Sequence, residues 1–71
     1  YMLFSEFLEN YRVEKNLSKK EVAGILEISP MYYGRFEKGD ILPTKRNIIR
    51  FSENLDIPLE ELTKFIKKPE E

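Results

Sequence analysis

The sequence predicts a compact all-α domain of five short helices. Apolar residues recur at helical spacing in five segments, start and stop residues separate these segments, and no segment has the alternation typical of a strand. The chain has 71 residues, enough for one hydrophobic core. The predicted helices cover residues 3–15, 19–26, 30–38, 45–55 and 59–67.

The first predicted helix spans residues 3–15. Phe4, Phe7 and Leu8 follow the i, i+3, i+4 spacing of one helix face, and the polar residues between them fall on other faces. Asn16 comes next, and asparagine tolerates the left-handed conformation that ends many helices. We therefore expect this helix to bury one face and to end just before Asn16.

The second and third helices begin with clear start signals. Ser18 and Glu21 match a capping box, in which each side chain accepts a hydrogen bond from the other residue's backbone amide. Ser29 and Pro30 form a second start, because proline is best tolerated at the first helical position. Residues 27–29 alone join the two helices, and this tight connection is typical of a helix-turn-helix motif.

The remaining boundaries follow from similar residues. Gly39 predicts the end of the third helix, and Thr44 can cap the fourth after a loop without helical periodicity. Pro58 lies next to the predicted start of the fifth helix. Residues 3–67 form the expected domain, and residues 68–71 form a polar tail or the start of a linker.

The composition excludes most catalytic chemistry. The chain has no His and no Cys, which removes Ser/His and Cys/His nucleophile pairs, thiolate chemistry, the usual zinc sites and disulfides. Glu37 and Asp40 are the nearest approach to an acid pair. We therefore expect no enzyme, no metal site and no cofactor.

The sequence also bears on location. Its apolar runs are far shorter than the ~20 residues that span a bilayer, and no signal-peptide pattern opens the chain. The expectation is a cytoplasmic protein without a membrane partner. Tyr1 precedes Met2, so we expect residue 1 to be a tag remnant or the chain to be part of a longer protein.

Residues around the predicted motif resemble a known family. Residues 17–23, 28–29 and 35–39 are similar to the matching segments of Cro/XRE-type, lambda-repressor-like helix-turn-helix DNA-binding domains. The resemblance covers about residues 4–62. It implies a lambda-repressor-like five-helix fold and sequence-specific binding of double-stranded DNA by a transcription regulator. The resemblance implies either a repressor of bacterial, phage or plasmid origin, or the DNA-binding domain of a larger regulator.

The resemblance also implies an ion pair between Arg12 and Glu37, and three residues depart from the family pattern. Glu27 stands where glycine is usual, at a cost of roughly 1 kcal/mol if φ is positive. Tyr33 replaces a buried aliphatic residue, so its hydroxyl needs a partner or solvent. Gly34 lies inside a helix, where it costs ~1 kcal/mol relative to alanine.

The third helix carries the candidate residues for base recognition. At 100° per residue, one stripe contains Met31, Gly34, Arg35 and Lys38. Arg35 is expected to donate two hydrogen bonds to a guanine. Met31 and Tyr32 are expected to pack on thymine methyl groups, and Gly34 to allow close approach to the bases. The resemblance places positions 30, 31 and 35 at base-contacting sites, where Pro30 has no donor and contributes shape only.

For the same residues, roles other than contact with DNA bases stay open. Arg35 can be a solvated charge, Gly34 a tolerated small residue, and Met31 with Tyr32 a small protein-contact patch. A different class of function is therefore a protein-interaction module, such as an antitoxin-like protein or an anti-repressor, that uses the same fold to bind a protein partner.

Phosphate contacts are expected from helix N-termini and nearby cations. The candidates are Ser18, Lys19, Lys38, Gly39, Thr44, Lys45 and Arg46. Residues 12–50 carry nine basic and five acidic side chains, although the whole chain has a net charge of -1. Affinity per domain should therefore be modest and salt-sensitive.

Modest affinity favours pairing, and the family resemblance implies a homodimer on a two-fold symmetric operator. The apolar face of the fifth helix is a candidate for the dimer surface, and closing the core is an equally good role for it. The residues of this face are Leu59, Leu62, Phe65 and Ile66.

Overall fold

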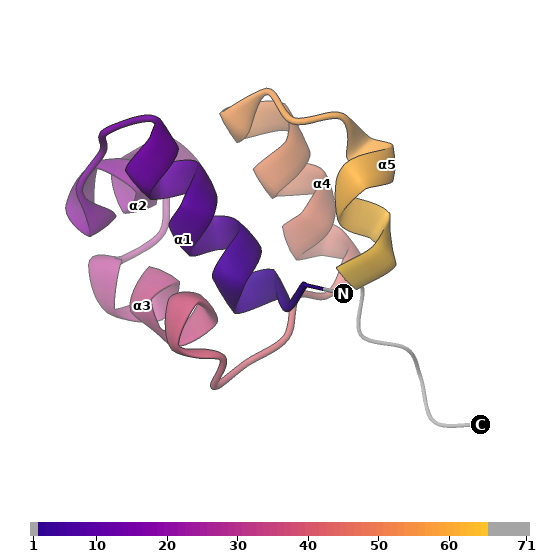
Figure 1. Ribbon diagram of the computed structural model, residues 1–71, viewed down its shortest axis with the longest axis horizontal. Coiled ribbons are helices and arrows are strands. Elements are labelled where there is room, and N and C mark those ends of the chain that lie inside the picture. Colours follow the sequence, from indigo (N-terminus) through magenta and orange to yellow (C-terminus); the bar gives the residue numbers. More distant parts are fainter. Residues whose placement is uncertain (1, 66–71) are drawn as a thin grey trace.

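The computed structural model describes residues 2–65, and within them the predicted all-α fold is confirmed (Figure 1). The elements are α1 (Phe4–Glu14), α2 (Lys19–Leu26), α3 (Pro30–Lys38), α4 (Lys45–Leu55), α5 (Leu59–Leu62) and a short 3₁₀-helix, η1 (Thr63–Phe65). None of the described helices is long and apolar enough to cross a bilayer.

The bounds of α2, α3 and α4 agree with the prediction, because local caps determine where these helices begin. Ser18 Oγ accepts a hydrogen bond from the Glu21 backbone amide at 3.1 Å, and Glu21 Oε1 accepts one from the Ser18 amide at 2.7 Å. Ser29 and Thr44 likewise accept from the amides three residues later. These bonds satisfy amides that have no partner within the helix.

Residues in the left-handed region follow four of the helices. Asn16, Glu27 and Asp56 have φ values of 60°, 62° and 58°, and Gly39 has a φ of 86°. The sequence predicts this conformation at Asn16 and Gly39. Asp56 carries no such prediction, although aspartate is one of the residue types that tolerate it.

The first and fifth helices are shorter than predicted. Leu3 and Lys15 are the caps of α1 rather than part of it, and Leu3 has an extended backbone. The fifth helix was expected over residues 59–67, but the α-helix makes a single turn before η1 begins. The Thr63 hydroxyl donates to the Glu60 carbonyl at 3.3 Å, a bond that fits the tighter winding common at helix ends. Residues 66–71, with the predicted tail, lie outside the described residues.

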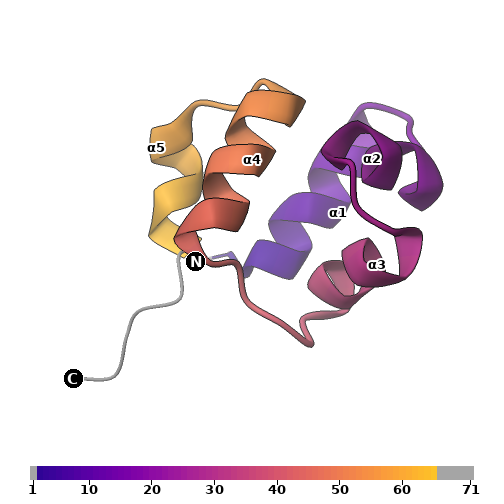
Figure 2. The ribbon, with the colours of Figure 1, turned by 180° about the vertical axis from the view of Figure 1, so that it is seen from behind.

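Seen along the direction of Figures 1 and 2, α1 appears between α2 and α3 on one side and α4 and α5 on the other, while α2 packs directly on both α3 and α4. Three phenylalanine rings meet at the centre of the core. The ring centroids of Phe4 and Phe36 are 5.9 Å apart, those of Phe4 and Phe51 are 5.6 Å apart, and those of Phe36 and Phe51 are 5.3 Å apart. Each such pair contributes ~0.5–1.5 kcal/mol beyond the burial of its area. The cluster therefore holds α3 against both α1 and α4.

Two hydrogen bonds from side chains to the carbonyls at helix ends also join helices to one another. Asn54 Nδ2 donates to the Ile25 carbonyl at 3.0 Å, which attaches α4 to the last turn of α2. The Tyr11 hydroxyl donates to the Leu55 carbonyl at 2.9 Å, which attaches α1 to the end of α4. Both bonds use carbonyls that have no partner within their own helix.

Candidate nucleic-acid interface

The turn between α2 and α3 is tight and left-handed. The Glu27 amide donates to the Gly24 carbonyl at 3.1 Å, and the Ile28 amide donates to the Ala23 carbonyl at 3.0 Å. These bonds satisfy the Ala23 and Gly24 carbonyls near the end of α2, as in a Schellman motif. The turn directs α3 away from α2 at once, and Glu27 carries the strain that glycine would avoid.

The inner side of α3 is fixed by packing. Tyr33 and Phe36 have no exposed surface, and Phe36 belongs to the central aromatic cluster. Tyr32 lies at the margin of this side, with 37% of its surface exposed, and its ring packs edge-to-face on the Phe36 ring with the two centroids 5.1 Å apart. The helix therefore cannot rotate about its axis without unpacking the core.

A buried carboxylate ties three parts of the chain together. Glu37 Oε2 accepts from Arg12 Nε at 2.8 Å and from the Tyr33 hydroxyl at 2.6 Å, and its Oε1 accepts from Arg12 Nη2 at 3.3 Å. Arg12 also donates to the Leu17 carbonyl at 3.2 Å. One group of side chains thus joins α1, the loop before α2, and α3.

The structure brings Arg12 and Glu37 together in the pairing that the family resemblance implies. It also supplies the partner that the Tyr33 hydroxyl needs. Because Tyr33 and Glu37 are four residues apart on one helix, their spacing alone was a usable signal for this contact.

The pKa values of these groups follow from their surroundings. Burial raises the pKa of Glu37, but hydrogen bonds from Arg12 and Tyr33 outweigh it, so the net pKa is lowered. Burial raises the pKa of Tyr33 strongly, and its bond to the Glu37 carboxylate adds to this effect. At neutral pH the carboxylate is therefore ionised and the phenol is protonated, as their short hydrogen bond requires.

The sequence did not predict one further member of this group. Lys19 Nζ, from the first turn of α2, lies 4.0 Å from Glu37 Oε1. Its side chain is 57% exposed, so the ammonium group still faces solvent. The packing of α2 against α3 brings these two residues together. Because they are far apart in the sequence, no local pattern predicts the contact.

The outer side of α3 is open. Met31 is 81% exposed, and the Arg35, Lys38 and Pro30 side chains are also exposed. Among residues 2–65, Arg35 has no ion-pair partner. A Cβ added at Gly34 would meet no atom within 4 Å, so nothing inside the domain requires glycine there. The predicted stripe is thus accessible along its whole length.

The candidate phosphate-binding residues lie at three helix ends. Ser18 and Lys19 lie at the start of α2, and Lys38 and Gly39 lie at the end of α3. The third group, at the start of α4, follows the loop after Gly39. In Figure 1, α3, the 39–44 loop and the start of α4 follow one another along one edge of the molecule. The third group comprises Thr44, Lys45 and Arg46, all exposed.

The structure distinguishes the residues of the candidate dimer surface by their burial. Leu62 is fully buried and closes the core, so it is not accessible to a partner. Phe65 packs on Phe4 and Phe7, with ring centroids 5.3 Å and 5.4 Å away. Leu59 is 46% exposed, and Ile66 lies outside the described residues. The described part of the face mainly completes the core, because α5 packs against α4 and Phe65 of η1 packs against α1.

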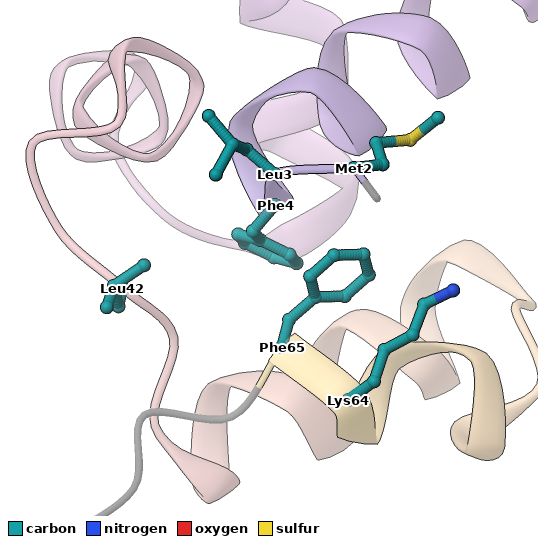
Figure 3. Close-up of a pocket in the computed structure, with 6 residues that line it drawn as sticks. All are labelled: Met2, Leu3, Phe4, Leu42, Lys64 and Phe65. Atoms are coloured by element: carbon teal, nitrogen blue, oxygen red, sulfur yellow. The ribbon is translucent and has the colours of Figure 1, made fainter.

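Figure 3 shows how Phe65 meets Phe4 at the N-terminal end of α1. The two rings line a cavity of about 340 Å³ with apolar walls. Its other lining residues are Met2, Leu3, Leu42 and Lys64. Among residues 2–65 no group of side chains could hold a metal ion, and this cavity holds no pair of carboxylates.

Comparison with known proteins agrees with this geometry. The helix-turn-helix family matches residues 8–62, which include α2, α3 and α4 completely. The chain is 33% identical over 61 residues to the cryptic phage CTXphi transcriptional repressor RstR of Vibrio cholerae serotype O1 (strain ATCC 39315 / El Tor Inaba N16961). The match covers 86% of this chain and 54% of the relative, so the chain spans about half the length of that protein.

No solved structure matches the chain significantly. The family match extends over more than half of the chain and coincides with the tight α2–α3 turn and the open outer side of α3. The chain therefore belongs to the helix-turn-helix family, as its resemblance to Cro/XRE-type domains predicted.

Proposed function

We propose that this chain is a sequence-specific DNA-binding domain of a transcription regulator, and that α3 reads the major groove of double-stranded DNA. The observation that carries the proposal is the two-sided nature of α3. Its inner side is locked by Tyr33 and Phe36, while its outer side presents Arg35 without an acidic partner among the described residues. A repressor as a relative supports the same function.

The roles of the site residues belong to this proposal. Arg35 donates to guanine O6 and N7, a contact that discriminates by ~1–3 kcal/mol. Lys45, Arg46 and Lys38 contact phosphates as exposed cations, and the amides at the starts of α2 and α4 add to these contacts. Ser18 and Thr44 cap the Glu21 and Asn47 amides, which leaves the earlier amides of each first turn for phosphate.

We further propose that two copies bind a two-fold operator, with half-sites about 34 Å apart. A net charge of -1 limits the affinity of a single copy, and pairing on DNA compensates for this. The test is the stoichiometry on a selected operator, measured by sedimentation. Two chains per full site and one per half-site are expected. A regulator of this kind acts in the cytoplasm, where bacterial DNA lies.

The experiment on base reading compares a selected operator with a scrambled duplex across a range of salt concentrations. Arg35→Ala should abolish the preference for the selected site, whereas wild-type binding should weaken steeply with salt on both duplexes. Arg35→Lys is the matched control because it keeps the charge and loses the planar fork. It should retain the salt dependence and lose most of the preference.

Phosphate contacts are separated from base reading by a second pair of variants. Lys45→Ala should lower affinity equally for both duplexes and make the salt dependence shallower by about one ion. Lys15→Ala removes the same charge at the end of α1, where the ammonium group lies 5.6 Å from the Tyr11 ring, and should change neither quantity. If wild type prefers no duplex even at low salt, the proposal is wrong, and Met31 and Tyr32 become the candidates for a protein contact.

A further inference from the structure

The first turn of α3 is unusual for a surface that reads bases by hydrogen bonding. Met31 is the most exposed large hydrophobic residue among those described, at 81%. Its neighbour Pro30 has no amide hydrogen, and the hydroxyl oxygen of Ser29 already accepts from the Tyr32 amide at 3.1 Å. The accessible side chains of this turn are therefore mainly apolar.

One turn later the chemistry changes. Arg35 follows Met31 by four residues, so both side chains lie on the same outer stripe. Gly34 lies between them in the sequence and has no side chain to hold the helix away from a groove. The outer face of α3 thus presents an apolar contact and a bidentate donor, separated by one helical turn.

Each of these groups has one natural counterpart in the major groove. The C5-methyl of thymine is the apolar group there, and guanine O6 and N7 are the paired acceptors that suit arginine. Methionine is flexible and polarisable, which suits contact with a methyl group. A hydrogen-bonding base edge opposite Met31 would instead lose its water without gaining a partner.

The spacing of Met31 and Arg35 along the helix limits how far apart their two contacts can lie along the DNA. Four residues of α-helix advance ~6 Å, and successive base pairs are ~3.4 Å apart. We infer that each operator half-site contains a guanine read by Arg35 and, within about two base pairs of it, a thymine whose methyl group packs on Met31. This inference rests on the proposed DNA-binding function and specifies the sequence that the function selects.

The test alters one functional group of the DNA at a time. The 71-residue chain is first used to select a preferred duplex from a random pool. Each thymine of that duplex is then replaced by deoxyuridine, which lacks only the methyl group, and each guanine by 7-deazaguanine, which lacks only the N7 acceptor. Dissociation constants are measured for wild type, Met31→Ala, Arg35→Ala and Val13→Ala, the last being an exposed apolar control on α1.

One deoxyuridine substitution should weaken wild-type binding about fourfold, roughly the effect of losing one buried methyl group. The same substitution should leave Met31→Ala unaffected, while Val13→Ala should respond as wild type does. One 7-deazaguanine within about two base pairs should weaken wild type at least fivefold and leave Arg35→Ala unaffected. These couplings together support the inference.

Two other outcomes are distinguishable. If a duplex is clearly preferred but no deoxyuridine substitution near the critical guanine weakens binding, or if Met31→Ala responds to it as wild type does, the thymine assignment is wrong and the proposed function stands. If the selection yields no preferred duplex at all, the proposed function fails, and the inference fails with it.

Discussion

Glu27 shows how a single residue can strain a turn that the fold requires. It has a φ of 62° at the α2–α3 turn, where a side chain costs roughly 1 kcal/mol relative to glycine. Glu27→Gly should therefore stabilise the domain by about this amount and raise the midpoint of thermal unfolding by about 4–8 °C.

The matched control for this change is Glu27→Ala, which removes the charge but keeps the Cβ that causes the strain. Thermal unfolding followed by circular dichroism should show little gain for this variant. Equal stabilisation by alanine would mean that the acidic charge at the end of α2, rather than the backbone conformation, is the unfavourable feature.

The two helical glycines make a second prediction possible at this scale. A Cβ at Gly24 or at Gly34 would meet no atom within 4 Å, so alanine should stabilise α2 or α3 by ~0.5–1 kcal/mol in either case.

Only Gly34 lies on the outer stripe of α3. Gly34→Ala should weaken binding to a selected operator about tenfold or more, whereas Gly24→Ala should bind as wild type does. Unchanged binding by Gly34→Ala would make that glycine a tolerated small residue.

At the scale of elements, the Glu37 carboxylate links α1 to α3. Burial raises the pKa of Glu37, but the hydrogen bonds from Arg12 and Tyr33 lower it below 4.5 overall. A lowered pKa in the folded state means that the ionised carboxylate stabilises the fold above about pH 4.5. This contribution is lost as the pH falls through the lowered pKa.

Between pH 6 and pH 3, the free energy of unfolding should fall more in wild type than in Glu37→Gln. Urea unfolding at several pH values measures this free energy. Glu37→Gln should be less stable than wild type at neutral pH, because Arg12 then lacks its partner in a partly buried site. Parallel pH profiles for the two proteins would show that other carboxylates dominate the acid response.

Tyr33→Phe tests the remaining bond of the same group. It deletes the hydroxyl that donates to Glu37 at 2.6 Å and keeps the buried ring. Because hydrogen bonds to charged groups contribute ~1.5–3 kcal/mol, urea unfolding should detect a loss of that order. Tyr32→Phe is the control, since no hydrogen bond from the Tyr32 hydroxyl is present among the described residues.

At the scale of the whole molecule, one aromatic cluster supports the small core. Phe51 contacts both Phe4 and Phe36, so Phe51→Ala should cost ~3–5 kcal/mol. That is a large part of the stability of a domain this small. The variant should show a strongly lowered or absent cooperative thermal transition. Leu59→Ala, at an exposed position, should change stability by only about 0.5 kcal/mol. A small effect of Phe51→Ala would mean that the cluster is not the main support of the core.

The features that depend on neighbours along the chain could be predicted from the residues alone. Ser18, Ser29 and Thr44 cap their helices through amides three residues away, so α2, α3 and α4 begin where predicted. The exposed stripe of α3 follows from helical periodicity, and Gly39 ends the helix because glycine readily adopts a positive φ.

Contacts between groups that are distant in the sequence depend on how the helices pack, and they could not be predicted in this way. The tertiary structure placed Lys19 beside Glu37, and it shortened the fifth helix. It also buried Leu62, which periodicity alone left equally available to a partner. The physical reason is that an apolar stripe specifies that a helix must bury one face, whereas the packing of the other helices decides what covers it.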